Sequence, residues 1–206
     1  GAPGLYAALA EKGYFPKEEL NNLRKIDSML QGHPEMKGTP GVDMTTGSLG
    51  QGLAAANGMA LAGKLDNKDY KVYALIGDGE AQEGIIWEAA MLAAHYKLDN
   101  LIVLLDHNGL QIDGKNKDIM NIEPVDEKFK AFGWHVISID GHDFEEIFNA
   151  IDEAKKVEGK PTMIIAKTIK GKGVSYMEDQ VGWHGKAPSK EEAEKAMEEL
   201  GGVLDD

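Results

Sequence analysis

The sequence predicts an α/β protein with a doubly wound, mostly parallel sheet and helices on both faces. Strand-length apolar runs alternate with helix-length segments between residues 71 and 166, an order typical of that class. Leu101 to Leu105 is an unbroken apolar run, as expected of a central parallel strand covered on both faces. One strand is followed by Gly-Asp-Gly and the next by Asn-Gly, which predicts polar groups at one sheet edge.

Length and composition limit the possible classes. The 206 residues and 42 % apolar content suit one ordinary domain, or one large domain with a tail, and we expect a single domain over 1–206. The formal net charge of −13 argues against nucleic acid or an anionic membrane as a partner. Without cysteine, a basic-then-apolar leader or a membrane-length apolar run, the chain is expected to be cytoplasmic.

The N-terminal segment contains two expected helices. The chain begins with Gly1 and has no initiator methionine, so we expect an upstream segment to be missing. Leu5 to Lys12 can form a short helix, and Pro16 suits the first position of a second. Apolar residues at helical spacing predict a buried face on that second helix: Leu20, Leu23, Ile26 and Leu30.

A long irregular segment follows, from Gln31 to Gly52, where repeated glycines and two prolines prevent a regular element. Loops this long in compact domains are usually functional or disordered, and its low charge favours function. Leu49 to Lys64 reads as a helix rich in alanine and glycine. Such small residues allow close packing against a neighbour, so we expect a homodimer or a heterotetramer.

The remaining elements complete the alternation of strand and helix. Strands are predicted at 71–76, 101–105, 136–139 and 162–166, with helices at 80–96 and 144–157 and a polar loop reaching about Asn121. Ser189 and Glu192 form a capping box for a charged, solvated last helix ending near Leu200.

The ends of the first two strands carry the clearest chemistry. Gly77-Asp78-Gly79 exposes backbone N–H groups that can bind phosphate at a helix start, while Asp78 offers a carboxylate. Asn108 follows 30 positions later, and the Gly109 turn lets the Leu110 carbonyl provide a third oxygen. Oxygen ligands suit Mg²⁺ or Ca²⁺ shared with a diphosphate. The alternative is a helix cap at Asp78 and an ordinary turn at Asn108. Walker and Gly-x-Gly-x-x-Gly motifs are absent.

Two of the six histidines are candidates for function. His33 and His184 each lie in a glycine-rich irregular segment, where they could contact phosphate, shuttle protons or only support the loop. The others have structural explanations in a helix, in strands or at a turn: His95, His107, His135 and His142.

These residues resemble the transketolase family. The Gly77-Asp78-Gly79 and Asn108 pattern is similar to its thiamine diphosphate motif. The further matching stretches are 33–35, 45–52, 140–143, 167–173 and 184–185. The resemblance covers nearly the whole chain and implies a thiamine diphosphate-binding fold.

It also implies roles for individual residues. Asp78, Asn108 and the Leu110 carbonyl would hold Mg²⁺ or Ca²⁺, and Gly77 and Gly79 would lie at the diphosphate. Gly47 and Leu49 would meet the aminopyrimidine through their backbones, and Ile112 would pack against the thiazolium. His33 and His184 would face substrate hydroxyls and cofactor phosphates, and Glu83 would link two active sites across a subunit interface. The reaction would be transfer of a two-carbon ketol unit between sugar phosphates.

Some departures from the family pattern concern the partner. In transketolases an activating glutamate belongs to a second domain, and this chain ends at Asp206 before any such domain. The resemblance therefore implies the N-terminal half of a split transketolase, with the pyrimidine-binding half on another chain.

Other departures from the family pattern concern single residues. Two upstream histidines of the family are absent. Ser48 stands where proline is common in the family, with little consequence expected because backbone atoms make the contact.

Two other kinds of function stay open at this level. One is a subunit of another thiamine diphosphate enzyme, such as a deoxyxylulose phosphate synthase or a 2-oxoacid decarboxylase. The other is a non-catalytic binding or assembly protein on the same fold. Substrate assays would distinguish the first alternative from a transketolase subunit. Calorimetry with thiamine diphosphate and Mg²⁺ would test the second.

Overall fold

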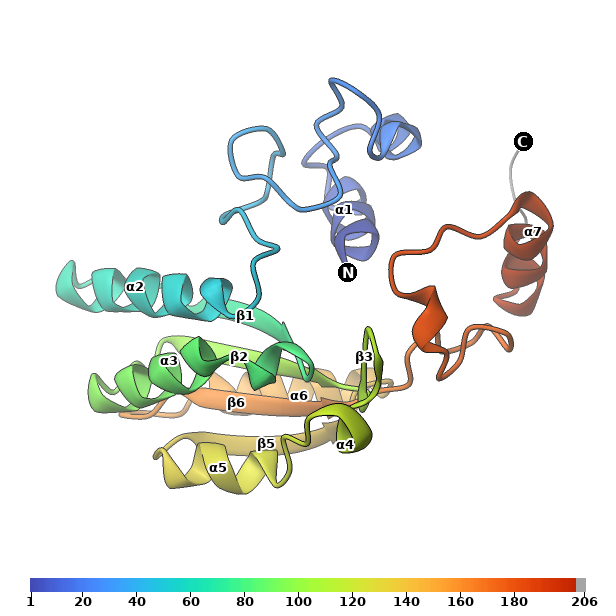
Figure 1. The fold of residues 1–206 in the computed structure, drawn as a ribbon. Coiled ribbons are helices and arrows are strands. Elements are labelled where there is room, and N and C mark those ends of the chain that lie inside the picture. Colours follow the sequence, from blue (N-terminus) through green and yellow to red (C-terminus); the bar gives the residue numbers. More distant parts are fainter. Residues whose placement is uncertain (203–206) are drawn as a thin grey trace. The chain divides into compact units, whose positions relative to one another are not determined.

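The computed structural model describes residues 1–202 and divides the chain into two compact units, with the boundary between Gly52 and Leu53 (Figure 1). The first unit has one buried apolar cluster, and the second has two. The predicted domain over 1–206 stays a prediction, and its last four residues lie outside the described ones.

The first unit contains α1 (Ala2–Glu11) and a 3₁₀ helix, η1 (Lys17–Asn22). Tyr6 is completely buried, and its hydroxyl donates to the carbonyl of Gln31 over 2.7 Å. Its buried apolar neighbours are Leu9, Ala10, Phe15, Leu30 and Val42. The segment from residue 31 to 50 has neither helix nor strand, as predicted.

The predicted helix from Pro16 to Leu30 is wrong. Only the 3₁₀ turn of η1 forms, and both Arg24 and Asp27 adopt positive φ, near 61° and 62°, which a helix cannot contain. Leu30 is buried as predicted, whereas Ile26 is 93 % exposed. The apolar spacing was therefore insufficient to distinguish a helix from a compact series of turns.

The second unit is organised by a parallel sheet of four strands. They are β1 (Val72–Gly77), β2 (Leu101–His107), β5 (His135–Asp140) and β6 (Thr162–Lys167), in the order β1-β2-β6-β5. Gly77 lies beside Asp106, and Asp106 beside Ala166. This register brings the carboxyl ends of β1, β2 and β6 to one edge of the sheet.

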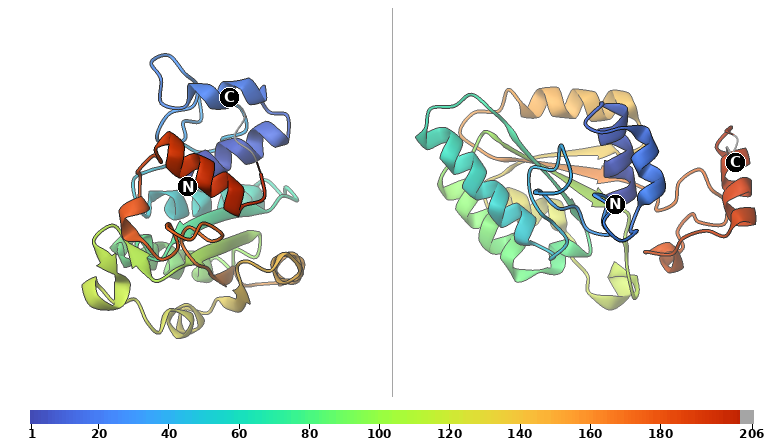
Figure 2. Two further views of the ribbon diagram at one scale, coloured as in Figure 1. Left: turned by 90° about the vertical axis from the view of Figure 1, so that its right-hand side faces the viewer. Right: turned by 90° about the horizontal axis from the view of Figure 1, so that it is seen from above.

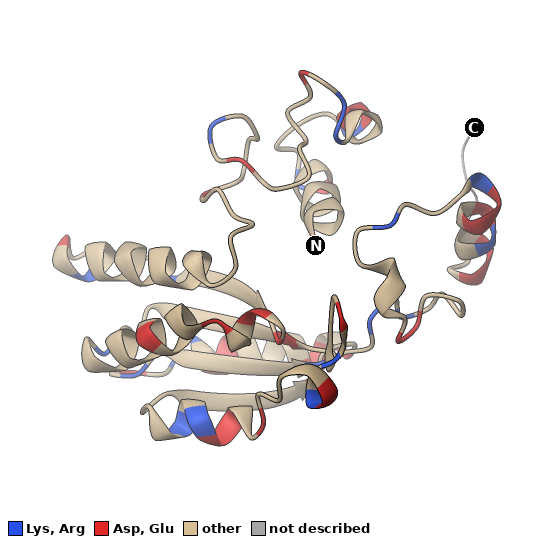
Figure 3. Ribbon diagram, in the orientation of Figure 1, with Lys and Arg blue, Asp and Glu red and all other residues tan. Residues whose placement is uncertain are grey.

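Helices cover both faces, which confirms the predicted doubly wound class (Figure 2). α2 (Gln51–Leu65), α3 (Gly84–His95) and α5 (Val125–Ala131) pack on one face, and α6 (Phe144–Ala154) packs on the other. α2 carries Lys64 as its one charged residue (Figure 3). Its residues Leu53, Ala56 and Ala60 belong to the core on this face, and Asn57 donates its side-chain amide to the Ala89 carbonyl of α3 over 2.8 Å.

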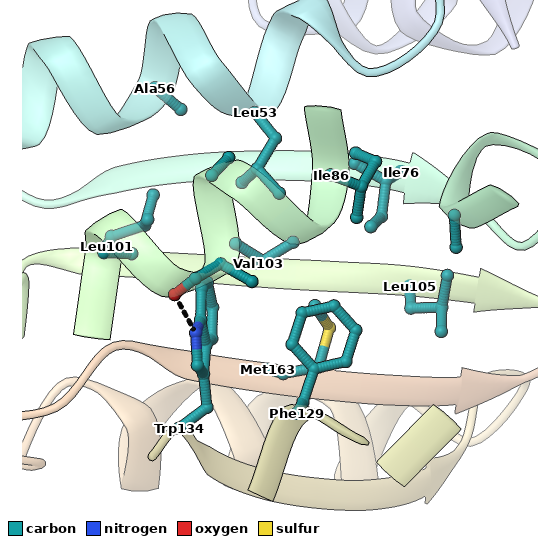
Figure 4. Packing of buried hydrophobic residues seen from close by; sticks show 14 of the residues in the cluster. Leu53, Ala56, Ile76, Ile86, Leu101, Val103, Leu105, Phe129, Trp134 and Met163 are labelled. Carbon is teal, nitrogen blue, oxygen red and sulfur yellow. Dashed lines mark hydrogen bonds between the residues drawn. The ribbon is translucent and has the colours of Figure 1, made fainter. Parts of the chain in front are cut away.

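The larger core lies between the sheet and the three helices (Figure 4). Trp134 is 3 % exposed, and its indole N–H donates to the Ala90 carbonyl of α3 over 2.9 Å. Phe129 of α5 packs edge-on against Trp134, with ring centroids 5.4 Å apart. One polar group is thereby satisfied inside an otherwise apolar layer.

Several elements of this unit differ from the prediction. The helix expected over 80–96 is two elements, a 3₁₀ turn η2 (Glu80–Gln82) and α3, because Glu83 is extended. α5 was not predicted. The polar loop after Asn108 contains a small ribbon, β3 (Leu110–Gln111) with β4 (Gly114–Lys115), and then α4 (Asn116–Ile119).

The C-terminal segment contains η3 (Val181–Trp183) and α7 (Lys190–Glu199). The capping box of Ser189 and Glu192 is present as predicted, and none of the residues of α7 is buried. Both kinds of charge occur along α7 (Figure 3). None of the helices within residues 1–202 has the length and apolar character needed to span a membrane.

Candidate functional site

Asp78 is the central group of the candidate site. It directly follows β1 and is only 1 % exposed. Its Oδ1 accepts the N–H of Gly79 over 2.9 Å, and its Oδ2 accepts the N–H of Gly109 over 2.5 Å. Within residues 1–202 neither lysine nor arginine is among the charges that act on it. A buried carboxylate therefore stands at the sheet edge without a lysine or arginine to balance it.

The surroundings of Asp78 favour a bound cation. Burial raises the pKa of Asp78 above its ordinary value, and the Gly109 N–H, the Asn116 amide, His107 and the Gly79 N–H lower it only in part. A buried charge without a counterion is costly, and a divalent cation would remove that cost.

Asn108 and Leu110 lie on the turn that contacts Asp78. Asn108 follows β2, and its Oδ1 accepts the N–H of Leu110 over 2.9 Å. The bond from Gly109 to Asp78 joins this turn to the end of β1. The structure thus brings together the three residues predicted as metal ligands. No group of three His, Cys, Asp or Glu side chains suited to a metal occurs in the described residues, so amide and carbonyl oxygens would have to contribute.

Gly77, the last residue of β1, and Gly79 flank Asp78 in the sequence. Gly77 donates its N–H to Glu80 Oε2 over 3.2 Å. A Cβ at Gly79 would lie 3.2 Å from the Cβ of Gln111, which leaves little space for a side chain. Glu83, exposed, directly precedes α3. Ile112 lies at the turn between β3 and β4 and is 64 % exposed, so its side chain is accessible for packing.

His184 lies after η3 in the C-terminal segment and is exposed. Its pKa is lowered, first by partial desolvation and second by the positive charge of Lys170. Lys170 was not singled out from the sequence, although it belongs to the 167–173 stretch that resembles the family. The ammonium group of Lys170 is therefore close enough to the His184 imidazole to affect its pKa.

His33 and Gly47 are brought together in the first unit. Gly47 has a φ of +131°, and a Cβ there would collide with the imidazole of His33. The N–H of Thr46 donates to the Pro34 carbonyl over 3.2 Å, which holds the two arms of this loop side by side. Leu49 follows in the same loop and is 52 % exposed. The predicted residues of this loop therefore form one local group.

Comparison with known proteins gives the family. Residues 2–204 match the family described as "Transketolase, thiamine diphosphate binding domain". The chain belongs to the transketolase family. The predicted family, its N-terminal half and its thiamine diphosphate-binding fold are thereby confirmed.

Two transketolase subunits are among its relatives. The chain is 52 % identical over 200 residues to the 6-deoxy-6-sulfo-D-fructose transketolase subunit SqwG of Clostridium sp. (strain MSTE9), covering 97 % of this chain and 73 % of that protein. It is 46 % identical over 200 residues to an apulose-4-phosphate transketolase subunit of Actinobacillus succinogenes, covering 97 % of this chain and 72 % of that protein.

Single-chain transketolases share the fold over a smaller part of their length. The transketolase of Leishmania mexicana has a TM-score of 0.89 and 35 % identity, covering 97 % of this chain and 31 % of that one. The Campylobacter jejuni transketolase has a TM-score of 0.85 and 43 % identity, covering 90 % of this chain and 30 % of that one. The chain thus spans about a third of these transketolases, the part that contains the thiamine diphosphate-binding domain.

Proposed function

We propose that this chain is the thiamine diphosphate- and metal-binding subunit of a two-chain transketolase. The reaction moves a two-carbon ketol unit from a ketose phosphate to an aldose phosphate. The observation that carries the proposal is the buried carboxylate of Asp78, without a lysine or arginine partner and joined by the Gly109 N–H to the turn holding Asn108 and Leu110. The match to the thiamine diphosphate-binding domain supports thiamine diphosphate as the diphosphate bound at this site.

The residues around Asp78 hold the metal and the diphosphate. The Asp78 carboxylate, the Asn108 carboxamide and the Leu110 carbonyl coordinate Mg²⁺ or Ca²⁺, and the backbone at Gly77 and Gly79 approaches the diphosphate. Thiamine diphosphate, when bound, would supply the electron sink needed to break and form the carbon–carbon bond. The protein positions the cofactor and supplies the charged and polar groups that hold its diphosphate and the metal.

The other predicted residues act on the rest of the cofactor and on substrate. Gly47 and Leu49 present backbone groups to the aminopyrimidine, and the exposed Ile112 packs against the thiazolium. His33 and His184 contact substrate hydroxyls and cofactor phosphates. The lowered pKa of His184 favours its neutral form, which can accept or donate a hydrogen bond without carrying charge.

A separate chain completes the catalytic centre. Two relatives are named as transketolase subunits, which supports a partner that carries the pyrimidine-binding half. Glu83 would link the two active sites across a subunit interface. We expect the assembly to be a homodimer or a heterotetramer, although the alanines of α3 pack inside this chain and do not mark the interface.

The test is ketol transfer by the protein purified from its source cells with any chain that copurifies. The substrate panel includes common ketose phosphates, 6-deoxy-6-sulfo-D-fructose and apulose 4-phosphate, with an aldose phosphate as acceptor. We expect transfer only when both chains are present. Decarboxylation of a 2-oxoacid without ketol transfer would contradict the proposal, as would the absence of thiamine diphosphate binding in calorimetry with Mg²⁺.

A further inference from the structure

Asp106 lies beside the proposed metal site, near the end of β2 and two residues before Asn108. We propose that it is a positioning residue, which holds the Asn108 carboxamide with its oxygen available to the cation. The inference rests on the proposed function, because it assumes that Asn108 is a metal ligand. Neither the predicted ligand set nor the family resemblance included Asp106.

The contacts run from β2 to β6. Asn108 Nδ2 donates to Asp106 Oδ2 over 3.2 Å. The other carboxylate oxygen of Asp106 accepts a hydrogen bond from the hydroxyl of Thr168, which directly follows β6. The N–H of Thr168 donates to the carbonyl of His107 over 3.2 Å, so its backbone is also held to β2. Asp106 is half-buried, and none of the described lysines or arginines pairs with it.

These contacts decide which end of the carboxamide faces the carboxylate. An ionised carboxylate can only accept hydrogen bonds, so the amide end of Asn108 must face Asp106. Its oxygen, Oδ1, then points away and accepts the Leu110 N–H, with one lone pair left over. A flipped carboxamide would present an NH₂ group, which cannot coordinate a metal. Asp106 thus excludes the unproductive orientation.

Thr168 orients the carboxylate in turn. Without its hydroxyl, Asp106 could rotate about its side-chain torsions and align less well with Asn108. Groups that orient metal ligands from the next layer typically change metal affinity by about 10–100-fold when removed. The arrangement therefore predicts a measurable effect on metal binding, and a smaller one for Thr168 than for Asp106.

The experiment measures binding of Mn²⁺, an EPR-visible substitute for Mg²⁺, in the presence of thiamine diphosphate and with any copurifying chain. We expect Asp106→Asn to weaken Mn²⁺ binding by about 10–100-fold, because an amide at 106 can donate as well as accept and no longer dictates the orientation of Asn108. Asp140→Asn, at the end of β5 on the same sheet edge, is the matched control for lost charge and should leave affinity unchanged. The thermal midpoint of the metal-free protein reports any loss of folding.

Further variants separate orientation from charge. Thr168→Val keeps the Asp106 charge and should still weaken Mn²⁺ binding, whereas Thr168→Ser should not. In an Asn108→Ala background, Asp106→Asn should cause no additional loss, because its effect passes through Asn108. An undiminished loss in that background, or equal affinities in Asp106→Asn and Asp140→Asn, would overturn the inference. Unchanged binding in Asp78→Ala would instead refute the proposed metal site itself.

Discussion

The imidazole of His184 illustrates how one neighbouring charge can set a protonation state. Lys170 is the second cause of its lowered pKa, after desolvation. Removing the ammonium group should stabilise the imidazolium, so Lys170→Ala should raise the pKa of His184. An NMR titration of the imidazole carbons measures the shift directly.

Lys172→Ala is the control for this prediction. Lys172 is in the same loop, but its ammonium lies 3.9 Å from Glu178 and is not among the causes that act on His184. The two variants should therefore differ, and the difference should shrink at high salt because exposed charges are screened. Equal shifts in both variants would show that Lys170 has no specific effect.

Gly47 gives a second prediction at this scale. Its positive φ and its closeness to the His33 ring both oppose a side chain, so Gly47→Ala should lower the free energy of unfolding by about 1–3 kcal/mol. His33→Ala removes the ring, and the double variant should recover part of that loss. Gly58→Ala on α2 is the contrast, because its Cβ meets open space in a helix and should stabilise by about 0.5–1 kcal/mol. Urea denaturation measures all four.

Sequence patterns located some of these residues and missed others for physical reasons. Asp78 and Asn108 were found because strand ends in a parallel sheet share an edge. Asp106 could have been found, since it is a carboxylate at the end of the same strand and two positions before Asn108. Thr168 could not, because its contact requires knowing that β6 lies beside β2. The charge of Lys170 on His184 likewise depends on how an irregular loop folds.

Among the elements, regular periodicity predicted best. All four strands of the main sheet were located within two residues. The central strands β2 and β6 are buried apolar runs, and the edge strands β1 and β5 each contain a shorter group of apolar residues. The predicted helix from Pro16 failed because left-handed residues at Arg24 and Asp27 interrupt it. α5 was missed although acids occur in its first turn and lysines follow, because the segment is short and lies between turns.

Asp99, between α3 and β2, links the end of α2 to the turn before β6, and its charge supports a prediction about pH. Its Oδ1 lies 2.7 Å from the Lys64 ammonium at the end of α2, and its Oδ2 accepts the Gly159 N–H over 2.8 Å. Burial alone would raise its pKa, but these hydrogen bonds, with the charges of Lys64 and Lys71, hold the pKa below its ordinary 3.8. The ionised form is therefore favoured by folding.

A carboxyl group whose pKa is lower in the folded than in the unfolded protein stabilises the fold at pH values above the unfolded-state pKa. This contribution disappears as the pH falls through the folded-state pKa. Asp99→Asn should therefore cost about 1–2 kcal/mol at pH 7, and the cost should shrink below pH 3.8. Chemical denaturation at several pH values measures this difference. Asp152→Asn, in the exposed pair with Lys155, should have no measurable effect. A penalty for Asp99→Asn that is independent of pH would contradict the electrostatic explanation.

At the scale of the whole molecule, binding and stability are linked. The second unit holds the buried Asp78 carboxylate, and the first holds the loop with His33 and Gly47. A cofactor that binds only the folded protein stabilises it in proportion to the logarithm of its concentration over Kd. The metal should contribute to this through Asp78, where it would neutralise a charge that folding otherwise buries alone.

Metal removal should therefore destabilise the loaded protein. With thiamine diphosphate and Mg²⁺ at about 100 times Kd, binding contributes about 2.7 kcal/mol, which corresponds to roughly 5–11 °C in Tm for a chain of this size. EDTA should abolish that increase, and added Ca²⁺ should restore it. Asp78→Ala should show no metal-dependent increase, whereas Asp66→Ala, at an exposed position just after α2, should respond like the unsubstituted protein. Differential scanning fluorimetry measures the four cases, and an equal response of Asp78→Ala would place the metal elsewhere.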